Sequence, residues 1–417
     1  MGQLFFRLHV KSCRLLGTIK THRKMRGGSS NSSRNGEWDS LPLTVAFLIL
    51  DRLLEPAYHV RFAAICKHYG SLAKDYNQLN RLFNKALLPP PMLLILDKDR
   101  PTLATLCSVV SEGRIYKNVE LHYSTQRWRC CGSSHGWLAT VLDDVRAGST
   151  IALRNLFKKP STTICLPKLK VFSITKVVLS ADPTLNQDSY VVGVIHGYKG
   201  LAFIRANERH WICIEETSNI WDDIIFYKSQ IYAVGRRGEI VSVNLDGNNH
   251  NVPEAKLLTP ENPFPHIDRE RAYLNYLAES TKGDLLCIQR VLSRSTIYAK
   301  PKINGFKVYK VVFSDGDGSA VEQLLETRSI GDEALFVHNK NAAISVSTSN
   351  FPKCKPNSIY YTTDGYLKCP NGMSTFVFNL EDGTIKQPHP LSTMQRIALN
   401  TMQRKDTLQG HWIMPFF

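Results

Sequence analysis

The sequence predicts a mainly β protein, in which a small all-α motif precedes a large β-propeller of six or seven blades. Apolar residues follow helical spacing only between residues 37 and 85. Beyond the prolines at 89–91, short apolar runs alternate with turn residues over most of the remaining chain. A propeller accommodates many short strands without long open edges. A typical blade of about 45 residues gives the expected number of blades.

The helical segment carries two apolar stripes. The first consists of Val45, Leu48, Ile49, Leu50 and Leu53, and the second of Phe62, Ile65, Cys66, Tyr69 and Leu72-Ala73. Ser40 and Pro42 give the first helix a capping residue and a proline suited to its first turn, and Pro56 is expected to end it. Helices this short cannot bury both faces alone, so they require a partner or the rest of the chain.

Turn signals separate the apolar runs of the larger segment. Residues 241–245 alternate apolar and polar side chains and lead into Asp246-Gly247. Further Asp-Gly dipeptides start at residues 315, 317, 364 and 382. Both residue types accept positive φ, so an Asp-Gly pair between such runs indicates a β-hairpin.

Composition argues against several classes of protein. The net charge is +16, and half of it comes from residues 1–36, which hold eight Lys or Arg and no acidic residue. The mildly basic remainder gives little support to nucleic-acid binding. No apolar run reaches 18 residues, so neither a transmembrane helix nor a membrane partner is expected.

The first 36 residues form a basic leader that contains the Ser/Gly-rich tract 27–33, which is typical of a flexible linker. Transit peptides are likewise basic and poor in acidic residues. Alternatively, Lys20, Arg23, Lys24 and Arg26 can serve as a nuclear address, or the leader is simply disordered. We expect a location in the nucleus or cytoplasm, and in the mitochondrion if the leader is a transit peptide.

Residues with reactive side chains form no catalytic or metal-binding pattern. The ten cysteines lack Cys-x-x-Cys spacing, which fits reduced cysteines packed as small hydrophobic residues in an intracellular protein. His196 and His210 lack metal-ligand spacing. Ser133-Ser134-His135 lies between two glycines without a Gly-x-Ser-x-Gly elbow, which indicates a tight turn rather than a nucleophile and its base. No catalytic residue, metal or other cofactor is therefore expected.

Two charged features have competing interpretations. Gly235-Arg236-Arg237-Gly238 can hold an acidic target, since Arg side chains match carboxylates and phosphates, or it can be a solvated hairpin tip. Glu215-Glu216 and Asp222-Asp223 are sequential carboxylates, for which solvated turns are a sufficient explanation.

The helical segment resembles the F-box. The resemblance rests on Leu41-Pro42 with the apolar positions up to Leu53, and on residues 60–67 in the same register. In F-box proteins this apolar face docks on the Skp adaptor of a cullin-based ubiquitin ligase. The resemblance implies an adaptor-binding face made of Leu41, Pro42, Val45, Ile49, Leu50, Leu53, Ile65 and Cys66.

One position departs from the F-box pattern. Tyr69-Gly70 stands where the family usually has a Trp-Arg pair. Tyr69 can fill the apolar slot, whereas Gly70 removes a cation and loosens the helix end. The departure implies weaker adaptor binding.

The larger segment resembles the C-terminal β-propeller of plant KIB-type F-box proteins. The most specific similarity is Cys-Gly-Ser-Ser-His-Gly-Trp-Leu at residues 131–138. The other similar stretches, in order, are residues 225–238, 276–286, 330–336 and 351–360. The expected parts of the chain are a leader at 1–36, the F-box at 37–85, the propeller at 92–400 and a C-terminal tail at 401–417.

These features predict the non-catalytic, substrate-recognition subunit of a Skp–cullin–F-box ubiquitin ligase. We expect the F-box to bind the Skp adaptor, and through it the cullin scaffold, while the propeller binds a protein target of unknown identity. Such a subunit acts by holding its target near the ubiquitin donor. The alternative is a propeller interaction protein that acts outside any ligase, for instance in an organelle.

The leader is expected to be dispensable for folding, because residues 1–36 have no periodic apolar face. A chain that begins at residue 37 should melt at the same temperature as the full chain. A large fall in melting temperature would show instead that the leader packs on the folded part.

Overall fold

The protein is described by a computed structural model that defines two units of the chain. The described residues are 41–53, 56–83, 91–96, 102–108, 115–121, 123–124, 127–144, 146–156, 163–171, 173–197, 199–214, 220–245, 255–260, 263–264, 271–293, 303–314, 320–338, 343–351, 354–362, 375–386 and 410–414. The units are Met1–Leu87 and Leu88–Phe417. The predicted leader lies outside the described residues.

Three helices form the described part of the first unit: α2 (Leu43–Arg52), α3 (Pro56–Ala63) and α4 (Lys67–Phe83). Pro56 begins α3 instead of ending the preceding helix, because a proline in the first turn forfeits no helical hydrogen bond. The second apolar stripe is divided between α3 and α4. Four of its members, Phe62, Tyr69, Leu72 and Ala73, still share one core with Ala46, Leu50 and Tyr76, whereas Ile65 is exposed.

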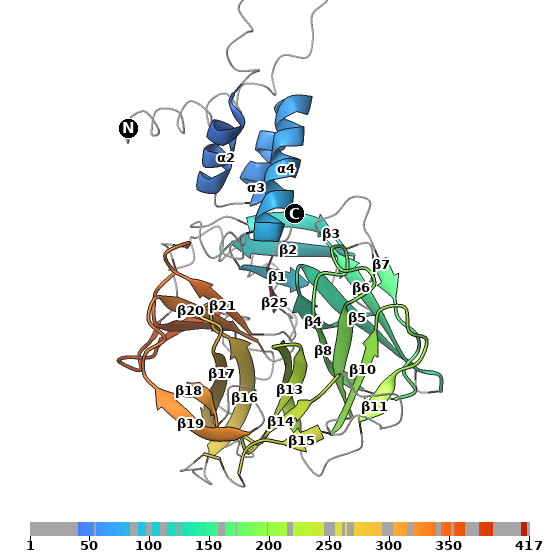
Figure 1. The fold of residues 1–417 in the computed structure, drawn as a ribbon, viewed down its shortest axis with the longest axis vertical. Coiled ribbons are helices and arrows are strands. Elements are labelled where there is room, and N and C mark those ends of the chain that lie inside the picture. Colours follow the sequence, from blue (N-terminus) through green and yellow to red (C-terminus); the bar gives the residue numbers. More distant parts are fainter. Residues whose placement is uncertain are drawn as a thin grey trace, which may run out of the picture. The chain divides into compact units, whose positions relative to one another are not determined.

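The described strands of the second unit form six sheets, which follow one another around a centre (Figure 1). The prediction of a propeller is therefore confirmed, with six blades. The first blade contains β1 (Met92–Leu96), β2 (Leu103–Ser108), β3 (Ile115–Glu120) and β25 (Gly410–Ile413). The second contains β4 (Arg129–Ser134), β5 (Trp137–Asp144), β6 (Gly148–Asn155) and β7 (Thr163–Cys165).

The next three blades repeat the four-stranded antiparallel pattern of the second. The third blade contains β8 (Ile174–Leu179), β9 (Val191–His196), β10 (Gly200–Arg205) and β11 (Ile212–Ile214). The fourth contains β12 (Trp221–Tyr227), β13 (Gln230–Gly235), β14 (Ile240–Val243) and β15 (Ala255–Leu257). The fifth contains β16 (Arg271–Glu279), β17 (Leu285–Ser293), β18 (Ile303–Phe313) and β19 (Val321–Thr327).

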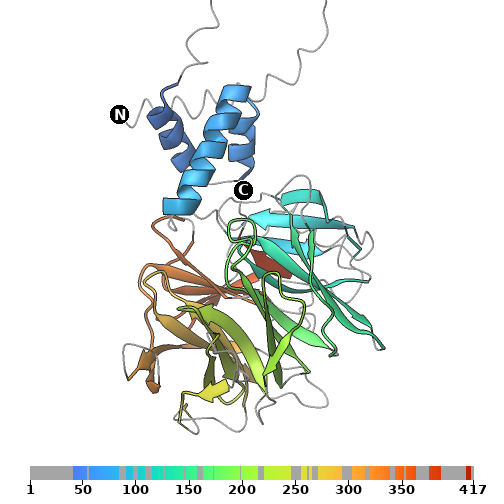
Figure 2. The same ribbon diagram turned by 45° about the vertical axis from the view of Figure 1, so that its right-hand side comes forward.

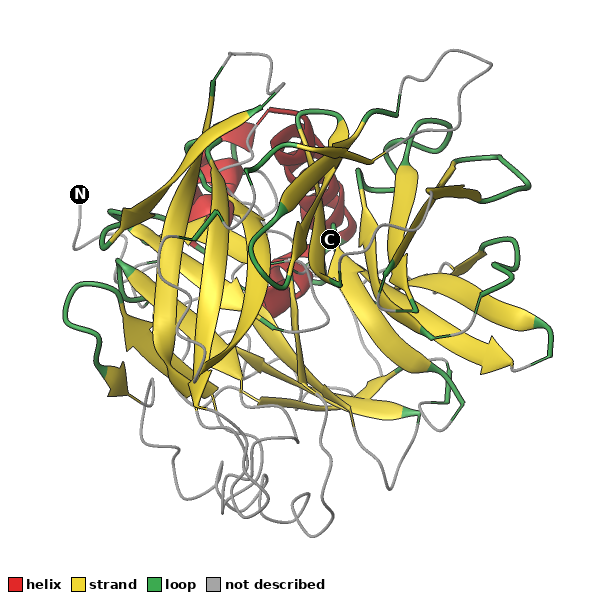
Figure 3. Cartoon of the chain, turned by 90° about the horizontal axis from the view of Figure 1, so that it is seen from below, coloured by secondary structure: helices red, strands yellow, loops and turns green. Residues whose placement is uncertain are grey.

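The sixth blade departs from this pattern. It contains β20 (Glu333–Val337), β21 (Ile344–Ser347), β22 (Ser358–Thr362), β23 (Thr375–Asn379) and β24 (Ile385–Lys386). Its order is β21-β20-β22-β23-β24, and β20 pairs with β22 in parallel. Strands account for the secondary structure of the whole described part of the propeller unit (Figure 3). No helix in the described residues is long and apolar enough to cross a membrane.

The ring is closed by the C-terminal end of the chain. β25 pairs antiparallel with β1, with Leu93 opposite Trp412, and lies beside β4 of the second blade. In Figure 2 this red strand lies next to the cyan strands of the first blade. The assignment of residues 401–417 to a tail is therefore wrong for Gly410–Ile413. These residues supply the inner strand that the first blade would otherwise lack.

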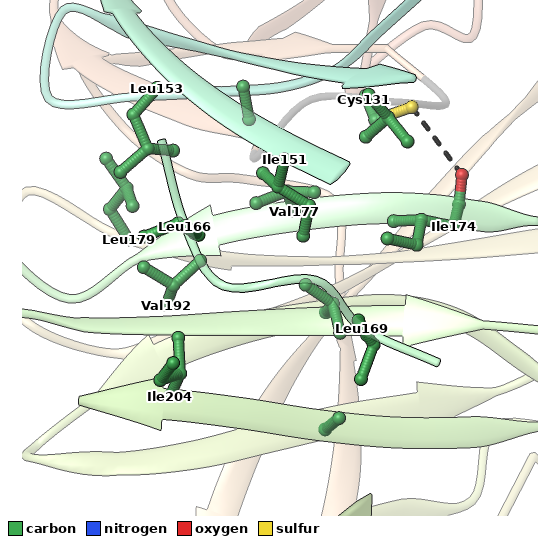
Figure 4. Close-up of a cluster of buried hydrophobic side chains, with 14 of the residues drawn as sticks. Cys131, Ile151, Leu153, Leu166, Leu169, Ile174, Val177, Leu179, Val192 and Ile204 are labelled. Atoms are coloured by element: carbon green, nitrogen blue, oxygen red, sulfur yellow. Dashed lines mark hydrogen bonds between the residues drawn. The ribbon is translucent and has the colours of Figure 1, made fainter. Parts of the chain in front are cut away.

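Neighbouring blades pack through continuous apolar clusters. Between the second and third blades, Ile151 and Leu153 of β6 share a cluster with Val177 and Leu179 of β8 (Figure 4). Gly132 permits this contact, because a Cβ there would collide with the backbone carbonyl of Val177.

Ring closure should make Trp412 one of the most sensitive residues of the propeller. Its side chain is fully buried and meets the Phe336 ring edge-on, with centroids 5.0 Å apart. Trp412→Ala should therefore destabilise the protein by about 3–5 kcal/mol, measured by thermal or denaturant unfolding. The control Leu325→Ala removes a side chain that is 50% exposed, and should change stability by about 0.5 kcal/mol or less. Equal effects of the two changes would contradict the closure.

Candidate functional site

The predicted adaptor-binding residues occupy different environments in the helical unit. Three of them are exposed, namely Pro42, Val45 and Ile65. Four are half-buried and pack against the core of the unit, namely Leu41, Ile49, Leu53 and Cys66. Leu50 is only 1% exposed and lies in that core with Ala46. Leu50 therefore belongs to the inward side of α2, and the adaptor-binding role of the other seven remains a prediction.

The structure adds two exposed leucines that the predicted face does not include. Leu43 is 50% exposed and Leu48 is 53% exposed, compared with 37% for Val45. Val45 and Leu48 are three residues apart and therefore lie on the same side of α2. Exposed apolar side chains gathered on one short helix are typical of a surface that binds a partner.

Polar contacts fix α2 to the following helices. The Tyr76 hydroxyl donates a hydrogen bond of 2.6 Å to Asp51 at the end of α2. The His59 ring contacts the Leu53 carbonyl, with 2.6 Å between Nε2 and the oxygen. Burial lowers the pKa of His59, against the opposing effects of this bond and of Asp51. These contacts hold the end of α2, where the Leu53 N–H also donates to the Leu50 carbonyl.

Tyr69 belongs to the helical core, and Gly70 is half-buried beside it. Tyr69 is buried and packs edge-on against Phe62, with ring centroids 5.0 Å apart. Gly70 lies inside the first turn of α4, where its N–H donates to the Cys66 carbonyl. A Cβ at Gly70 would lie 3.2 Å from the Ala63 carbonyl oxygen, so glycine permits close approach of α3 and α4. Gly70 thus lies near the beginning of α4, and its effect on the stability of that helix end stays a prediction.

The motif at residues 131–138 builds a contact between blades. His135 and Gly136 both have positive φ, at 50° and 76°, and form the tight turn between β4 and β5. The Trp137 indole donates a hydrogen bond of 2.9 Å to Asp182 of the third blade. The Ser134 hydroxyl accepts one from the Leu179 N–H, so its oxygen is engaged in packing. The motif thus connects the second blade to the third.

Asp223 connects three blades through one buried carboxylate. It forms an ion pair with Lys176 of β8 and accepts a hydrogen bond of 3.0 Å from the Leu277 N–H of β16. Burial raises the pKa of Asp223 and lowers that of Lys176, and each charge opposes the shift of the other. The expectation of a solvated turn at Asp222-Asp223 is wrong, because the cation that compensates Asp223 comes from another blade.

Asp222 extends this network toward the surface. Its carboxylate is 3% exposed, accepts a hydrogen bond of 3.1 Å from the Asn275 N–H, and contacts Arg236 Nε at 3.5 Å. Burial raises the pKa of Asp222 to about 6, while Asn275 and Arg236 lower it. The Arg236 side chain is itself 55% exposed. The network therefore runs from the buried Lys176 to a guanidinium at the surface.

The described residues carry reactive side chains, among them eight of the ten cysteines. Those residues contain no group of three His, Cys, Asp or Glu side chains that could hold a metal ion. The described cysteines are free thiols, and Cys130, Cys131, Cys287 and Cys354 are buried as expected. Cys165 and Cys213 are exposed, contrary to the expectation of packed cysteines.

Comparison with known proteins identifies the family of the propeller and relatives that match most of the chain. Residues 106–379 match the KIB1-4 beta-propeller family. F-box protein At4g35733 of Arabidopsis thaliana is 30% identical, covering 84% of this chain and 93% of the relative. F-box protein At2g26160 of the same plant is 31% identical, covering 78% and 95%. TolB of Acinetobacter baumannii, a solved structure, is 11% identical with a TM-score of 0.38 over 82% and 72% of the chains, too distant to bear on function.

The buried ion pair should respond to mutation as a unit. Lys176→Met leaves the Asp223 charge buried without its cation and should destabilise the protein by about 3–5 kcal/mol. Lys176→Met/Asp223→Asn should recover part of this loss. Lys310→Met, in an exposed pair with Asp284, should cost about 1 kcal/mol or less.

The pH dependence provides a second readout of the same pair. In the Lys176→Met variant the folded-state pKa of Asp223 rises further above its unfolded value. Stability is then lost as pH rises through the folded pKa and regained as pH falls toward the unfolded one. The melting temperature of Lys176→Met should therefore approach that of the wild type on mild acidification. A constant difference at every pH would show that Asp223 is not the responsible group.

Proposed function

Because the chain belongs to the plant F-box proteins with a KIB-type β-propeller, we propose that it is the substrate-recognition subunit of a Skp–cullin–F-box ubiquitin ligase. The helical unit binds the Skp adaptor, which connects it to the cullin scaffold, and the propeller binds the protein target. The subunit contributes no catalytic group. It accelerates transfer by raising the effective concentration of the target near the ubiquitin donor.

The observation that carries this proposal is the exposed apolar surface of α2. Val45 and Leu48 project from a helix whose opposite side is already packed in the core through Ala46 and Leu50. Apolar surface removed from water contributes roughly 25 cal/mol per Å². An adaptor that covers these side chains therefore gains binding energy without disturbing the fold of the helical unit.

The proposed location is the nucleus or the cytoplasm. A mitochondrial location, with a role outside any ligase, is the alternative if the basic leader is a transit peptide. Cleavage after the leader would support that alternative, whereas co-purification with a Skp adaptor would support the ligase.

The adaptor contact can be tested with charges placed on its exposed residues. Val45→Asp/Leu48→Asp puts two carboxylates into a desolvated interface, which should lower adaptor affinity by about a hundredfold or more. Because both positions are exposed, circular dichroism should not change. Binding is measured by titration of purified Skp adaptor against the full chain.

The control variant is Ser71→Asp/Lys74→Gln, which changes the net charge equally at exposed positions of α4. It should bind the adaptor as the wild type does. Wild-type affinity in the Val45→Asp/Leu48→Asp variant would show that this side of α2 is not the adaptor-binding surface.

A further inference from the structure

The strand directions place several turns at the same end of the propeller. The first strands of the second and third blades run parallel, since Cys131 bonds to Ile174 near their starts and Ser134 to Leu179 at their ends. The first strands of the fourth and fifth blades, β12 and β16, also run parallel. The Asn275 N–H donates to Asp222, and the Leu277 N–H donates to Asp223. The β5–β6, β9–β10 and β13–β14 turns, and the β7–β8 connection, therefore share one end of the ring.

This end carries a concentration of exposed cations, and we call it the basic end. Its exposed cations are Arg146 in the β5–β6 turn, Lys168 and Lys170 in the β7–β8 connection, Lys199 in the β9–β10 turn, and Arg236 and Arg237 in the β13–β14 turn. The turns at the opposite end mix both signs. They carry Lys228 and Lys282, but also Asp188 and Asp284.

The described carboxylates in the turns of the basic end accept hydrogen bonds from the backbone of those turns. Asp144 accepts hydrogen bonds from the backbone N–H groups of Arg146 and Ala147, at 2.9 and 3.1 Å. These bonds, together with the charge of Lys168, lower the pKa of Asp144. Glu239 accepts from the Arg237 N–H at 3.1 Å. Both carboxylates therefore bind the backbone N–H groups of the turns that carry the exposed cations.

The β13–β14 turn is held rigidly against two elements. The Asn275 side-chain amide donates to the carbonyls of Gly235 and Arg236, at 2.8 and 3.1 Å. The Arg236 N–H donates to the Ile220 carbonyl at 3.0 Å, and the Gly238 N–H closes the turn on Gly235. A side chain that projects from such a turn loses little backbone freedom when it binds a partner.

The side chain of Arg236 is also oriented, by its contact with Asp222. Its Nε contacts Asp222 at 3.5 Å, which leaves the two terminal amino groups of the guanidinium for another carboxylate. Arg237, the next residue, is exposed. The planar guanidinium group matches a carboxylate through two parallel hydrogen bonds.

We propose that the basic end of the propeller is the docking surface for an acidic segment of a polypeptide, with Arg236 and Arg237 as its main carboxylate-binding residues. This inference rests on the proposed function, in that the acidic segment belongs to the target. Of the two interpretations of residues 235–238, it adopts binding, with the exposed β13–β14 turn as the element that presents the two arginines.

A polypeptide fits this surface better than a nucleic acid does. Single-stranded nucleic acids are bound by cations together with aromatic side chains on which the bases stack. Among the Phe, Tyr and Trp residues whose burial the structure describes, none is exposed. Carboxylate side chains need only the cations and a fixed turn, both of which the basic end provides.

The test is the affinity of the full chain for a fluorescein-labelled peptide of alternating Glu and Ser, measured by fluorescence anisotropy. The wild type should bind it, and should not bind the matching peptide of Gln and Ser. Arg236→Gln/Arg237→Gln should weaken binding by about tenfold or more, since each change removes charge-assisted hydrogen bonds. The matched control Lys228→Gln/Lys282→Gln removes two cations from the opposite end, and should change affinity by less than about twofold.

Each contrary result has a defined meaning. Equal weakening by both double variants would overturn the inference, because binding would then follow net charge alone. A wild type that binds labelled oligouridine but not the Glu peptide would overturn it in favour of a nucleic acid. Absence of peptide binding together with normal Skp capture would overturn the inference and leave the proposed function intact. Peptide binding that depends on Arg236 and Arg237, without Skp capture, would overturn only the proposed function.

Discussion

The propeller depends on the pairing of its two chain ends in one blade. β25 is the inner strand of the first blade, where it pairs with β1 and lies beside β4. Without it, β1 would be paired only with β2, and the ring of Phe336 would lose its edge-on contact with Trp412. The entropic cost of closing a long loop grows only slowly with its length. The length of the chain between β1 and β25 therefore adds little to the entropic cost of closing the ring.

The strand pattern was largely predictable, whereas the closure was not. Alternating side chains and Asp-Gly pairs are local signals, and Asp382-Gly383 does form a turn, with Gly383 at φ 70°. The turn at Lys228 and Ser229 has no such signal, because two non-glycine residues adopt φ of 45° and 65° there. Gly410–Ile413 is too short to show a period, and its partner strand lies at the other end of the unit. Only tertiary structure identifies it as a strand.

The helical site shows the same limit on a smaller scale. Residues 45–50 are apolar at every position, so periodicity indicates a helix but cannot decide which side faces inward. Packing of α2 against α4 makes that decision, burying Leu50 and leaving Leu48 exposed. The prediction of a solvated turn at Asp222-Asp223 is wrong for a related reason. Adjacent acids suggest solvent, but Lys176 and Asn275 reach them from other blades.

This buried network also explains how a stable ring can present a defined binding surface. Replacing a buried ion pair with apolar side chains is often neutral or stabilising, so stability alone is a weak reason for Lys176 and Asp223. Their contacts instead fix the relative positions of the third, fourth and fifth blades. Asp222 contacts the Arg236 side chain and Asn275 bonds to its carbonyl, so the position of this turn residue is fixed as well. Because the core already holds the turn in place, a partner that binds Arg236 does not have to order it, and more of the contact energy remains as affinity.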